Sequence, residues 1–162
     1  SISKLRFPKG MAGCDLDAFA RVFLWSAGLD FAHGTGHGVG QFLSVHEGPQ
    51  RLSRTSNIPF KAGMIISNEP GFYKEGHFGI RIENLLAIKK APKLENSVID
   101  EMFVFETLNF VPIEKSLIEK GLMSADEIVW LNEYHSECRQ KIREYLEPDE
   151  KIWLDQATEE IK

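Results

Sequence analysis

The hydrophobic positions near the start of the chain follow the period of an α-helix. Between residues 15 and 27 they recur at intervals of three and four, at Leu16, Phe19, Ala20, Phe23, Leu24 and Ala27. This spacing places them along one stripe of a helix, which predicts that the stripe is buried in a core. Asp15 is the expected N-cap of the helix, and Gly28 is its expected stop.

Short runs of hydrophobic and β-branched residues in the middle of the chain are typical of strands. We expect strands over residues 64–68, 80–89 and 102–110, with loops over 50–59 and 90–97. Pro70 and Gly71 predict a turn directly after the first strand, which leaves Glu69 at the end of that strand.

The last third of the chain returns to a helical pattern. Ser124 and Glu127 form a capping box at the start of a helix. The stripe that follows consists of Ile128, Leu131, His135, Cys138, Ile142 and Tyr145. We expect a helix of roughly 20 residues that closes before Pro148, and a short helix from Asp149. Strands in the middle and helices at both ends predict an α+β fold.

Composition narrows the class of protein. The 162 residues suffice for one domain, and 43% hydrophobic with 27% charged residues is ordinary for a soluble globular protein. The net charge of -5 gives no nucleic-acid footprint. No apolar run approaches the roughly 20 residues of a membrane span. We therefore expect neither a nucleic-acid nor a membrane partner. Cys14 and Cys138 lie in no metal-binding spacing and fit a reducing cytosol.

Histidine and glycine concentrate in one segment. His33, His37 and His46 are three of the five histidines and fall within fourteen residues. Small residues, mostly glycine, separate the first two, and glycine lets the backbone approach a ligand closely. The segment is therefore a candidate binding site.

Two carboxylates in apolar surroundings follow this segment. Glu69 ends the first expected strand, and Glu83 lies within the run 80–86. One imidazole and two carboxylates are ligand chemistry for a divalent metal, which makes His37, Glu69 and Glu83 candidate metal ligands. Taken singly, each has a plainer interpretation. His37 could be a polar loop histidine, and Glu69 could belong to a turn. Glu83 could face solvent and pair with Arg81, because the two side chains share one face of the strand.

The order of these motifs resembles the pita-bread metallopeptidases, a family that holds methionine aminopeptidase, prolidase, aminopeptidase P and creatinase. The similar segments are 33–40, 45–49, 63–71, 78–84 and 130–135. Within the family they are most similar to the long, cytosolic form of aminopeptidase P, the Xaa-Pro aminopeptidases. The resemblance implies a partial pita-bread (creatinase/methionine aminopeptidase-like) fold, a curved antiparallel sheet with flanking helices. Residues 1–112 would be the C-terminal part of the catalytic domain, and 113–162 the C-terminal helical extension.

The resemblance also implies two divalent metal ions, commonly manganese, held by two Asp, one His and two Glu. His37, Glu69 and Glu83 match the last three of these ligands. The metals would activate a water for attack on the peptide bond before proline, with Glu69 as general base and then general acid. The implied substrate is a peptide with proline at the second position.

Three further residues match supporting positions of the family. His33 and His46 match histidines that position the substrate and stabilise the developing charge, which makes them candidate catalytic and substrate-binding residues. Arg81 matches an arginine that pairs with a ligand carboxylate. His77 and His135 have no such match, and we expect them on the surface or on a helix face.

The two Asp ligands of the family have no counterpart in this sequence. Asp15 and Asp17 fall on the expected helix and Asp30 at its exit, rather than on a strand pair upstream of His37. The chain also begins without Met, so we expect a fragment of a cytoplasmic parent enzyme. Such a fragment would bind metal weakly or not at all and would be inactive alone. Uncovered sheet edges would favour self-association of the fragment, whereas the resemblance implies a homodimer for the parent.

Three other interpretations stay open. The chain could be part of a prolidase or a methionine aminopeptidase, although residues 45–49 and the long last helix favour aminopeptidase P. It could be a pita-bread module that binds peptides or partners without catalysis. The presence of His37, Glu69 and Glu83 argues against such a module. The plainest alternative is an α+β domain whose histidines are incidental.

Overall fold

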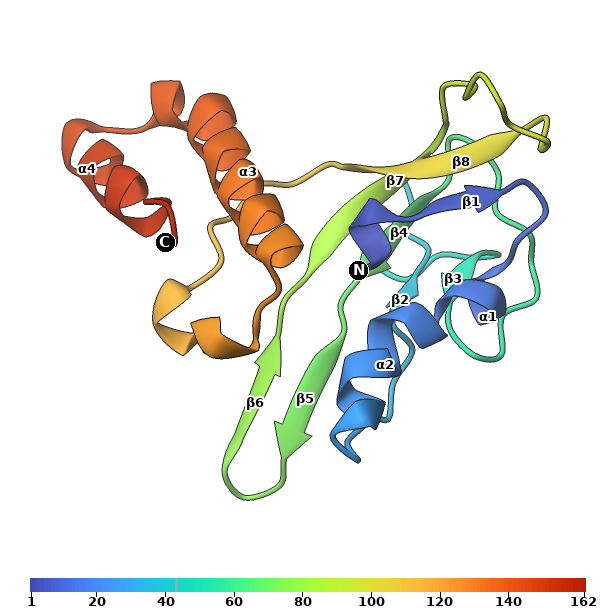
Figure 1. Cartoon of the computed structure of the whole chain (residues 1–162), viewed down its shortest axis with the longest axis horizontal. Helices are drawn as coiled ribbons and strands as arrows, with labels where there is room; N and C mark the ends of the chain where they lie inside the picture. The colour runs from blue at the N-terminus through green and yellow to red at the C-terminus, as the bar shows by residue number, and fades with distance from the viewer. Residues whose placement is uncertain (43) are drawn as a thin grey trace. The chain divides into compact units, whose positions relative to one another are not determined.

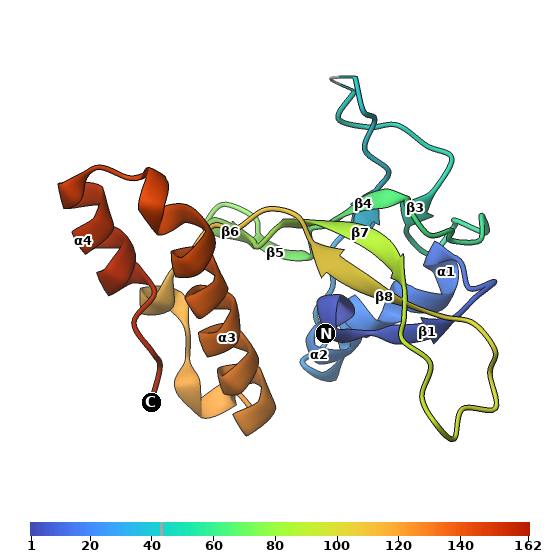
Figure 2. The ribbon, with the colours of Figure 1, turned by 90° about the horizontal axis from the view of Figure 1, so that it is seen from above.

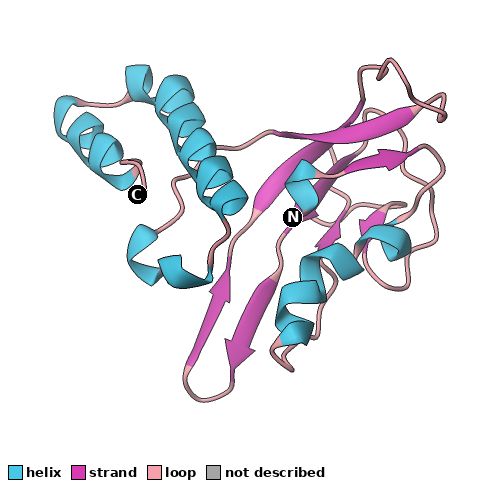
Figure 3. Ribbon diagram, in the orientation of Figure 1, coloured by secondary structure: helices cyan, strands magenta, loops and turns pink. Residues whose placement is uncertain are grey.

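The computed structural model describes residues 1–42 and 44–162, which form two compact units. The N-terminal unit covers residues 1–108 and contains all of the described strands (Figure 1). The C-terminal unit covers residues 109–162, and its regular structure is helical (Figure 3).

A four-stranded antiparallel sheet is the scaffold of the N-terminal unit. In order across the sheet, its strands are β1 (Arg6–Pro8), β8 (Met102–Thr107), β7 (Asn84–Lys90) and β4 (Ile65–Asn68). Ile66 lies opposite Leu86 and Ile88 opposite Phe105, and all four side chains are buried. The first and third expected strands are therefore confirmed, with slightly shorter ends.

The second expected strand, 80–89, is divided into two. β6 (Phe78–Arg81) pairs with β5 (Gly71–Lys74), whereas β7 belongs to the main sheet, and Ile82 and Glu83 lie between β6 and β7. The β5–β6 hairpin continues from β4 and β7 and projects away from the sheet (Figure 1). The prediction of one strand was wrong because a run of β-forming residues does not reveal which partner each half will pair with.

The turn predicted at Pro70 and Gly71 is also wrong. The chain stays extended there, and Gly71 is the first residue of β5. The reversal comes at Gly76, whose φ of +71° is a left-handed conformation that glycine adopts without steric cost. Proline restricts φ to a value that extended backbone also tolerates, so it did not require a turn.

A short pair of strands brings the glycine-rich segment against the sheet. β2 (Gly36–His37) pairs with β3 (Arg51–Leu52), and Gly38 forms a bridge to Ile66 in β4. A Cβ atom at Gly36 would lie 1.8 Å from the carbonyl oxygen of Ser67. No side chain fits in that space, so the approach of β2 to β4 requires glycine.

The N-terminal helix differs from its prediction. It is divided into α1 (Gly13–Leu16) and α2 (Ala18–Ser26), and the predicted stop at Gly28 is confirmed by a φ of +72°. Asp15 is the third residue of α1 rather than its N-cap. Its carboxylate accepts a hydrogen bond from the Ala12 N–H at 2.7 Å, so it caps the helix from inside the first turn.

Only part of the hydrophobic stripe of this helix is buried, against expectation. Leu16 joins the core, whereas Phe19 is 47% and Phe23 64% exposed. The buried side chain of α2 is instead Arg21, at 2% exposure. Helical periodicity identifies a common face, but it does not establish that other parts of the chain cover that face.

The core of the N-terminal unit is built mainly from the sheet. Its buried members are Ile2, Phe7, Leu16, Leu52, Phe60, Ile66, Leu86, Ile88, Phe103 and Phe105. The Phe7 ring lies 5.1 to 6.0 Å from the rings of Phe60, Phe103 and Phe105, measured between centroids. Burying one such side chain contributes about 1.5–3 kcal/mol, so this cluster gives the glycine-rich segment a firm support.

The C-terminal unit contains α3 (Ala125–Ile142) and α4 (Pro148–Ala157), which lie side by side (Figure 2). Three short 3-10 helices accompany them, η2 (Lys115–Leu117), η3 (Lys120–Leu122) and η4 (Arg143–Tyr145). The capping box of Ser124 and Glu127 is confirmed, whereas the last helix begins at Pro148 with Glu147 as N-cap. Within the described residues, no helix is both long and apolar enough to cross a membrane.

His135 lies on the buried face of α3, so of the two positions expected for it the helix face is the one observed, and its side chain is fully buried. Its Nε2 atom accepts a hydrogen bond from the Ile113 N–H at 3.1 Å. Burial lowers the pKa of His135, and the positive charges of Lys115 and Arg139 lower it further. His77, in contrast, is exposed, as expected.

Candidate functional site

Strand β2 brings His37 to the end of β4, where Glu69 lies. His37 Nε2 is 3.1 Å from Glu69 Oε1, although the two residues are far apart in the sequence. Ser67 links them, because its hydroxyl accepts a hydrogen bond from the His37 N–H at 2.9 Å and donates one to Glu69 Oε1 at 3.0 Å. Glu69 is 9% exposed, so its carboxylate sits at the floor of the site.

The contacts of His37 indicate which of its two ring nitrogens carries a proton. Its Nδ1 atom lies 3.0 Å from the Gly38 carbonyl oxygen, a contact that places a proton on Nδ1. In a neutral imidazole, Nε2 then carries a lone pair that faces the Glu69 carboxylate. Two acceptors 3.1 Å apart repel each other unless one of them is protonated or both coordinate a cation that lies beside them. This arrangement fits a divalent cation, for which imidazole nitrogen and carboxylate oxygen are common ligands.

A second side of Glu69 contacts Arg81. The Arg81 Nη1 atom is 3.3 Å from Glu69 Oε2, and Arg81 Nε donates a hydrogen bond to the Tyr73 hydroxyl at 2.8 Å. The hydrogen bond to Tyr73 is the main cause of a raised Arg81 pKa, and the charges of Glu69 and Glu83 add to it. Arg81 therefore presents a fixed positive charge beside the carboxylate.

His33 completes this chain of contacts through Tyr73. The His33 Nδ1 atom is 2.7 Å from the Gly34 carbonyl oxygen, which places a proton on Nδ1. The Tyr73 hydroxyl then donates a hydrogen bond to Nε2 at 2.9 Å. Contacts thus run without a break from His33 through Tyr73 and Arg81 to Glu69 and His37.

Tyr73 is a residue of the site that the motifs did not indicate. A Cβ atom at Gly71 would lie 2.6 Å from its hydroxyl, and one at Gly79 would lie 2.8 Å from its ring. Two glycines on neighbouring strands thus leave room for one aromatic ring. Glycine opposite an aromatic residue in a hairpin was the available signal, but it depends on the β5–β6 register.

His46 approaches the site from the other side of His37. The two imidazole rings are 4.1 Å apart between centroids, and both line a cavity of about 340 Å³ together with Glu47 and Arg51. Three glycines, Gly34, Gly36 and Gly38, form part of the cavity wall. The predicted gathering of histidines beside a glycine-rich backbone is therefore present, with His46 itself exposed.

Glu83 stands apart from the other two predicted ligands. It is exposed between β6 and β7. Across residues 1–42 and 44–162, no three side chains of His, Cys, Asp or Glu are grouped closely enough to hold a metal ion. The structure therefore brings together His37 and Glu69 of the predicted trio but not Glu83.

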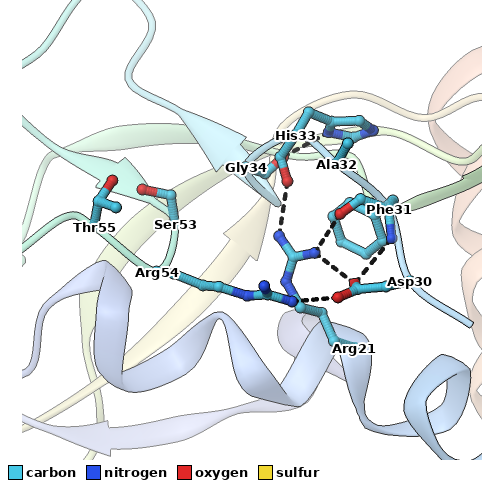
Figure 4. A pocket seen from close by; sticks show the side chains of 9 residues that line it. All are labelled: Arg21, Asp30, Phe31, Ala32, His33, Gly34, Ser53, Arg54 and Thr55. Carbon is cyan, nitrogen blue, oxygen red and sulfur yellow. Dashed lines mark hydrogen bonds and ion pairs between the residues drawn. The ribbon is translucent and has the colours of Figure 1, made fainter. Parts of the chain in front are cut away.

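The upstream aspartates belong to a different cluster. Asp17 pairs with Arg21. Asp30 pairs with both Arg21 and Arg54 beside the His33 backbone (Figure 4). Hydrogen bonds from Trp25 and from the two guanidinium groups hold the pKa of Asp30 well below its usual range. Both carboxylates are thus committed to arginine partners.

The sequence profile of metallopeptidase family M24 matches residues 1–90, more than half of the chain. The chain belongs to this family. The profile of the C-terminal region of peptidase M24 matches residues 101–161 of the M24 chain. The resemblance to metallopeptidases that the motifs indicated is therefore confirmed.

Relatives of this M24 chain are aminopeptidases P. It is 43% identical over 166 residues to a probable Xaa-Pro aminopeptidase P of Aspergillus niger, covering 99% of the chain and 27% of the relative. It is 42% identical to aminopeptidase P1 of Arabidopsis thaliana, covering 99% of the chain and 25% of that protein. The M24 chain thus spans about a quarter of the length of the curated relatives it matches.

A solved structure shares the fold of the M24 chain. X-prolyl aminopeptidase from Caenorhabditis elegans, described as a cytosolic enzyme with a di-nuclear active site, matches with a TM-score of 0.91 and 39% identity. The match covers 99% of the M24 chain and 26% of that enzyme. The expected pita-bread fold is confirmed, with mixed helices and antiparallel sheets.

Proposed function

We propose that this M24 chain forms part of an Xaa-Pro aminopeptidase, an enzyme that releases the N-terminal residue from peptides with proline in second position. The contact between His37 Nε2 and Glu69 Oε1 carries the proposal, because it faces two metal-type donors toward each other. Residues 1–112 would contribute to the catalytic domain and residues 113–162 would be its C-terminal extension. A cytoplasmic, homodimeric parent enzyme belongs to the same proposal.

In the parent enzyme, His37 and Glu69 would hold two divalent ions, for which we propose manganese, together with two aspartates from outside this chain and with Glu83, which the structure of this chain does not bring to them. When bound, the ions would supply Lewis-acid polarisation of the scissile carbonyl and a more acidic water. Three of five ligands leave too little negative charge and too few donors for tight binding. This chain by itself should therefore bind manganese weakly and should not cleave peptides.

Glu69 would move the proton during the reaction. Its Oε1 atom is fixed by the Ser67 hydroxyl and its Oε2 atom by Arg81, so the carboxylate keeps one orientation beside the cavity. From there it would take a proton from the attacking water and pass it to the departing proline nitrogen. That nitrogen bears no hydrogen of its own in the peptide, so its departure depends on the transferred proton.

His33 and His46 would position the substrate. His46 lines the cavity beside His37, where a donor could stabilise charge that develops on the carbonyl oxygen. The His33 ring is held by Gly34 on one nitrogen and by Tyr73 on the other, which fixes its plane. Arg81 would support both His33 and the general base, because it contacts Tyr73 and Glu69 at the same time.

A chimera tests the proposal. In the chimera, this chain replaces the matching quarter of the Caenorhabditis elegans X-prolyl aminopeptidase. The chimera should release arginine from Arg-Pro-Pro, and Glu69→Gln should lower kcat by about 10²–10⁴-fold. Glu75→Gln, at the exposed end of the β5–β6 hairpin, is the matched control and should leave the rate unchanged.

Two results would contradict the proposal. One is a folded chimera that binds metal normally but does not cleave Arg-Pro-Pro, which would favour a peptide-binding module without catalysis. The other is a chimera that cleaves the dipeptide Gly-Pro in preference to Arg-Pro-Pro, which would favour a prolidase. For this chain alone, titration calorimetry with manganese should show weak binding or none.

A further inference from the structure

Arg21 is a buried cation on a helix whose hydrophobic face is only partly buried. Its side chain is 2% exposed, and it does not contact the residues proposed to hold metal. Burial of a guanidinium is costly unless all its donors find acceptors. The position of those acceptors therefore indicates what Arg21 does for the fold.

One end of Arg21 is anchored within its own helix region. Nε donates to Asp17 Oδ2 at 2.5 Å and Nη2 contacts Asp17 Oδ1 at 3.2 Å, a two-point pairing of guanidinium and carboxylate. Burial tends to lower the pKa of Arg21, but hydrogen bonds and charges from Asp17 and Asp30 outweigh it and raise the pKa. The group is therefore held as a cation.

The other donors of Arg21 reach the segment that carries His33. Nη1 donates to the Phe31 carbonyl oxygen at 2.7 Å and to Asp30 Oδ1 at 2.8 Å, and Nη2 donates to the His33 carbonyl oxygen at 2.7 Å (Figure 4). The guanidinium carbon also lies 3.8 Å from the centroid of the Phe31 ring. One planar group thus binds two backbone carbonyls two residues apart.

The far end of the same segment is tied to the same carboxylate. Thr35 is fully buried, and its hydroxyl donates to Asp17 Oδ1 at 2.7 Å. His33 is therefore held on both sides, by Arg21 at its own carbonyl and by Asp17 through Thr35. Between these ties lies Gly34, which would otherwise leave the backbone free to rotate.

We propose that Arg21, anchored by Asp17, is the positioning residue for His33. The Asp17–Arg21 clamp, defined as these two side chains with their bonds to residues 31–35, sets the backbone from which the His33 ring reaches the Tyr73 hydroxyl. A lysine would keep the charge but could not bind both carbonyls and the carboxylate at once, because it lacks the planar fork. The catalytic consequence rests on the proposed function, whereas the effect on His33 does not.

Arg54 is a matched control for the clamp. Together with Arg21 it lines a cavity of about 490 Å³. It forms an ion pair with Asp30, and its Nε atom lies 3.8 Å from Asp17 Oδ2, but its side chain is 54% exposed. Within the described part of the chain, it makes no hydrogen bond to the carbonyls of residues 31–33. Arg54→Lys therefore changes the same charge cluster without releasing the His33 segment.

The first test uses this chain labelled with ¹⁵N-histidine and records the imidazole nitrogens by NMR. His33 should show the tautomer protonated at Nδ1, as its contacts with Gly34 and Tyr73 require. Arg21→Lys should mix the two tautomers and speed exchange of the Thr35 amide at least about tenfold. Arg54→Lys should change neither.

A folded Arg21→Lys variant with an unchanged His33 tautomer and unchanged Thr35 exchange would overturn the proposal. Circular dichroism establishes whether the variant is folded. If it is not, Thr35→Val decides, because it cuts the second tie of the clamp while keeping the side-chain shape. A folded Thr35→Val chain with the wild-type His33 tautomer would equally overturn it.

The second test measures coupling in the chimera. Arg21→Lys should lower kcat/KM for Arg-Pro-Pro about tenfold, but by less than twofold in a His33→Asn background, because both changes remove the same function. Independent effects in the double variant would overturn the positioning role. A wild-type chimera without activity would count against the proposed function alone, because the NMR test still judges the clamp.

Discussion

At the scale of single residues, the site depends on side chains that hold other side chains. Glu69 is oriented by Ser67 and Arg81, and His33 by Gly34 and Tyr73. The candidate ligands and histidines were recognisable from the motif, because residue type and spacing are local properties. Tyr73 was not, because its role arises only when β5 and β6 pair.

Tyr73→Phe tests the link between His33 and Arg81. Loss of the hydroxyl removes the donor to His33 Nε2 and the acceptor for Arg81 Nε. The chain should lose about 0.5–1.5 kcal/mol of unfolding free energy, and kcat of the chimera should fall about tenfold or more. Thermal denaturation and Arg-Pro-Pro cleavage measure the two effects. Tyr145→Phe, at an exposed tyrosine of the C-terminal unit, should affect neither.

At the scale of elements, the close contact between β2 and β4 sets the distance from His37 to Glu69. Gly36 faces the Ser67 backbone with no space for a side chain, and the His37 N–H binds the Ser67 hydroxyl next to it. The glycines of the motif suggested close backbone approach. What they approach is a strand of the same chain at Gly36, rather than a ligand.

Gly36→Ala should separate the two strands. A methyl group 1.8 Å from the Ser67 carbonyl oxygen forces backbone movement. We expect a loss of about 2–4 kcal/mol of unfolding free energy and faster amide exchange at His37, measured by urea denaturation and NMR. Gly48→Ala is the control, because its Cβ would meet its nearest atom at 3.8 Å. Equal stability of the two variants would contradict this account of the strand contact.

His135 makes the stability of the C-terminal unit sensitive to pH. Its folded pKa lies below the ordinary 6.5, so the unfolded chain takes up a proton first as pH falls. The unfolding free energy should keep its full value at pH values above 6.5. It should then decline as pH falls toward the lowered pKa. Amide exchange of α3 between about pH 7.5 and pH 5.5 measures this decline.

Replacement of the histidine provides the comparison. His135→Leu should remove the decline, while lowering stability by about 1–3 kcal/mol at every pH because the Ile113 N–H loses its acceptor. His77→Asn, at an exposed site, should keep the decline. An unchanged pH dependence in His135→Leu would show that another group is responsible.

At the scale of the whole molecule, the chain has a well-packed sheet core but leaves much of α2 exposed. The exposed hydrophobic side chains of this helix are Phe19, Val22, Phe23 and Trp25. Neighbouring exposed hydrophobic residues on one element favour association. The self-association expected from the sequence stays a prediction, and the helix gives it a second physical reason beyond open sheet edges.

Light scattering tests this prediction. The measured molar mass should be that of a dimer or a larger species, and the double variant Phe19→Ser/Phe23→Ser should lower this mass toward that of the monomer. Val98→Ser is the control, because Val98 is 97% exposed but lies on a loop away from α2. A monodisperse wild-type monomer would contradict the prediction.

The sequence by itself determined the elements that depend on near neighbours. The capping box at Ser124, the stop at Gly28 and the strands β4 and β8 of the main sheet follow from local propensity and period. The types and order of the candidate site residues were equally visible. The family motif was decisive here, because a lone histidine or glutamate would have had a plainer interpretation.

Only the tertiary structure decided which of these residues meet and which face of each element is covered. Arg21 lies outside the predicted hydrophobic stripe of its helix, yet it is the buried side chain of α2, and its burial depends on carbonyls about ten residues away. His135 is buried because Ile113, far along the chain, supplies its partner. Burying a polar group is favourable only when a partner meets it, and such partners are set by the path of the whole chain rather than by local sequence.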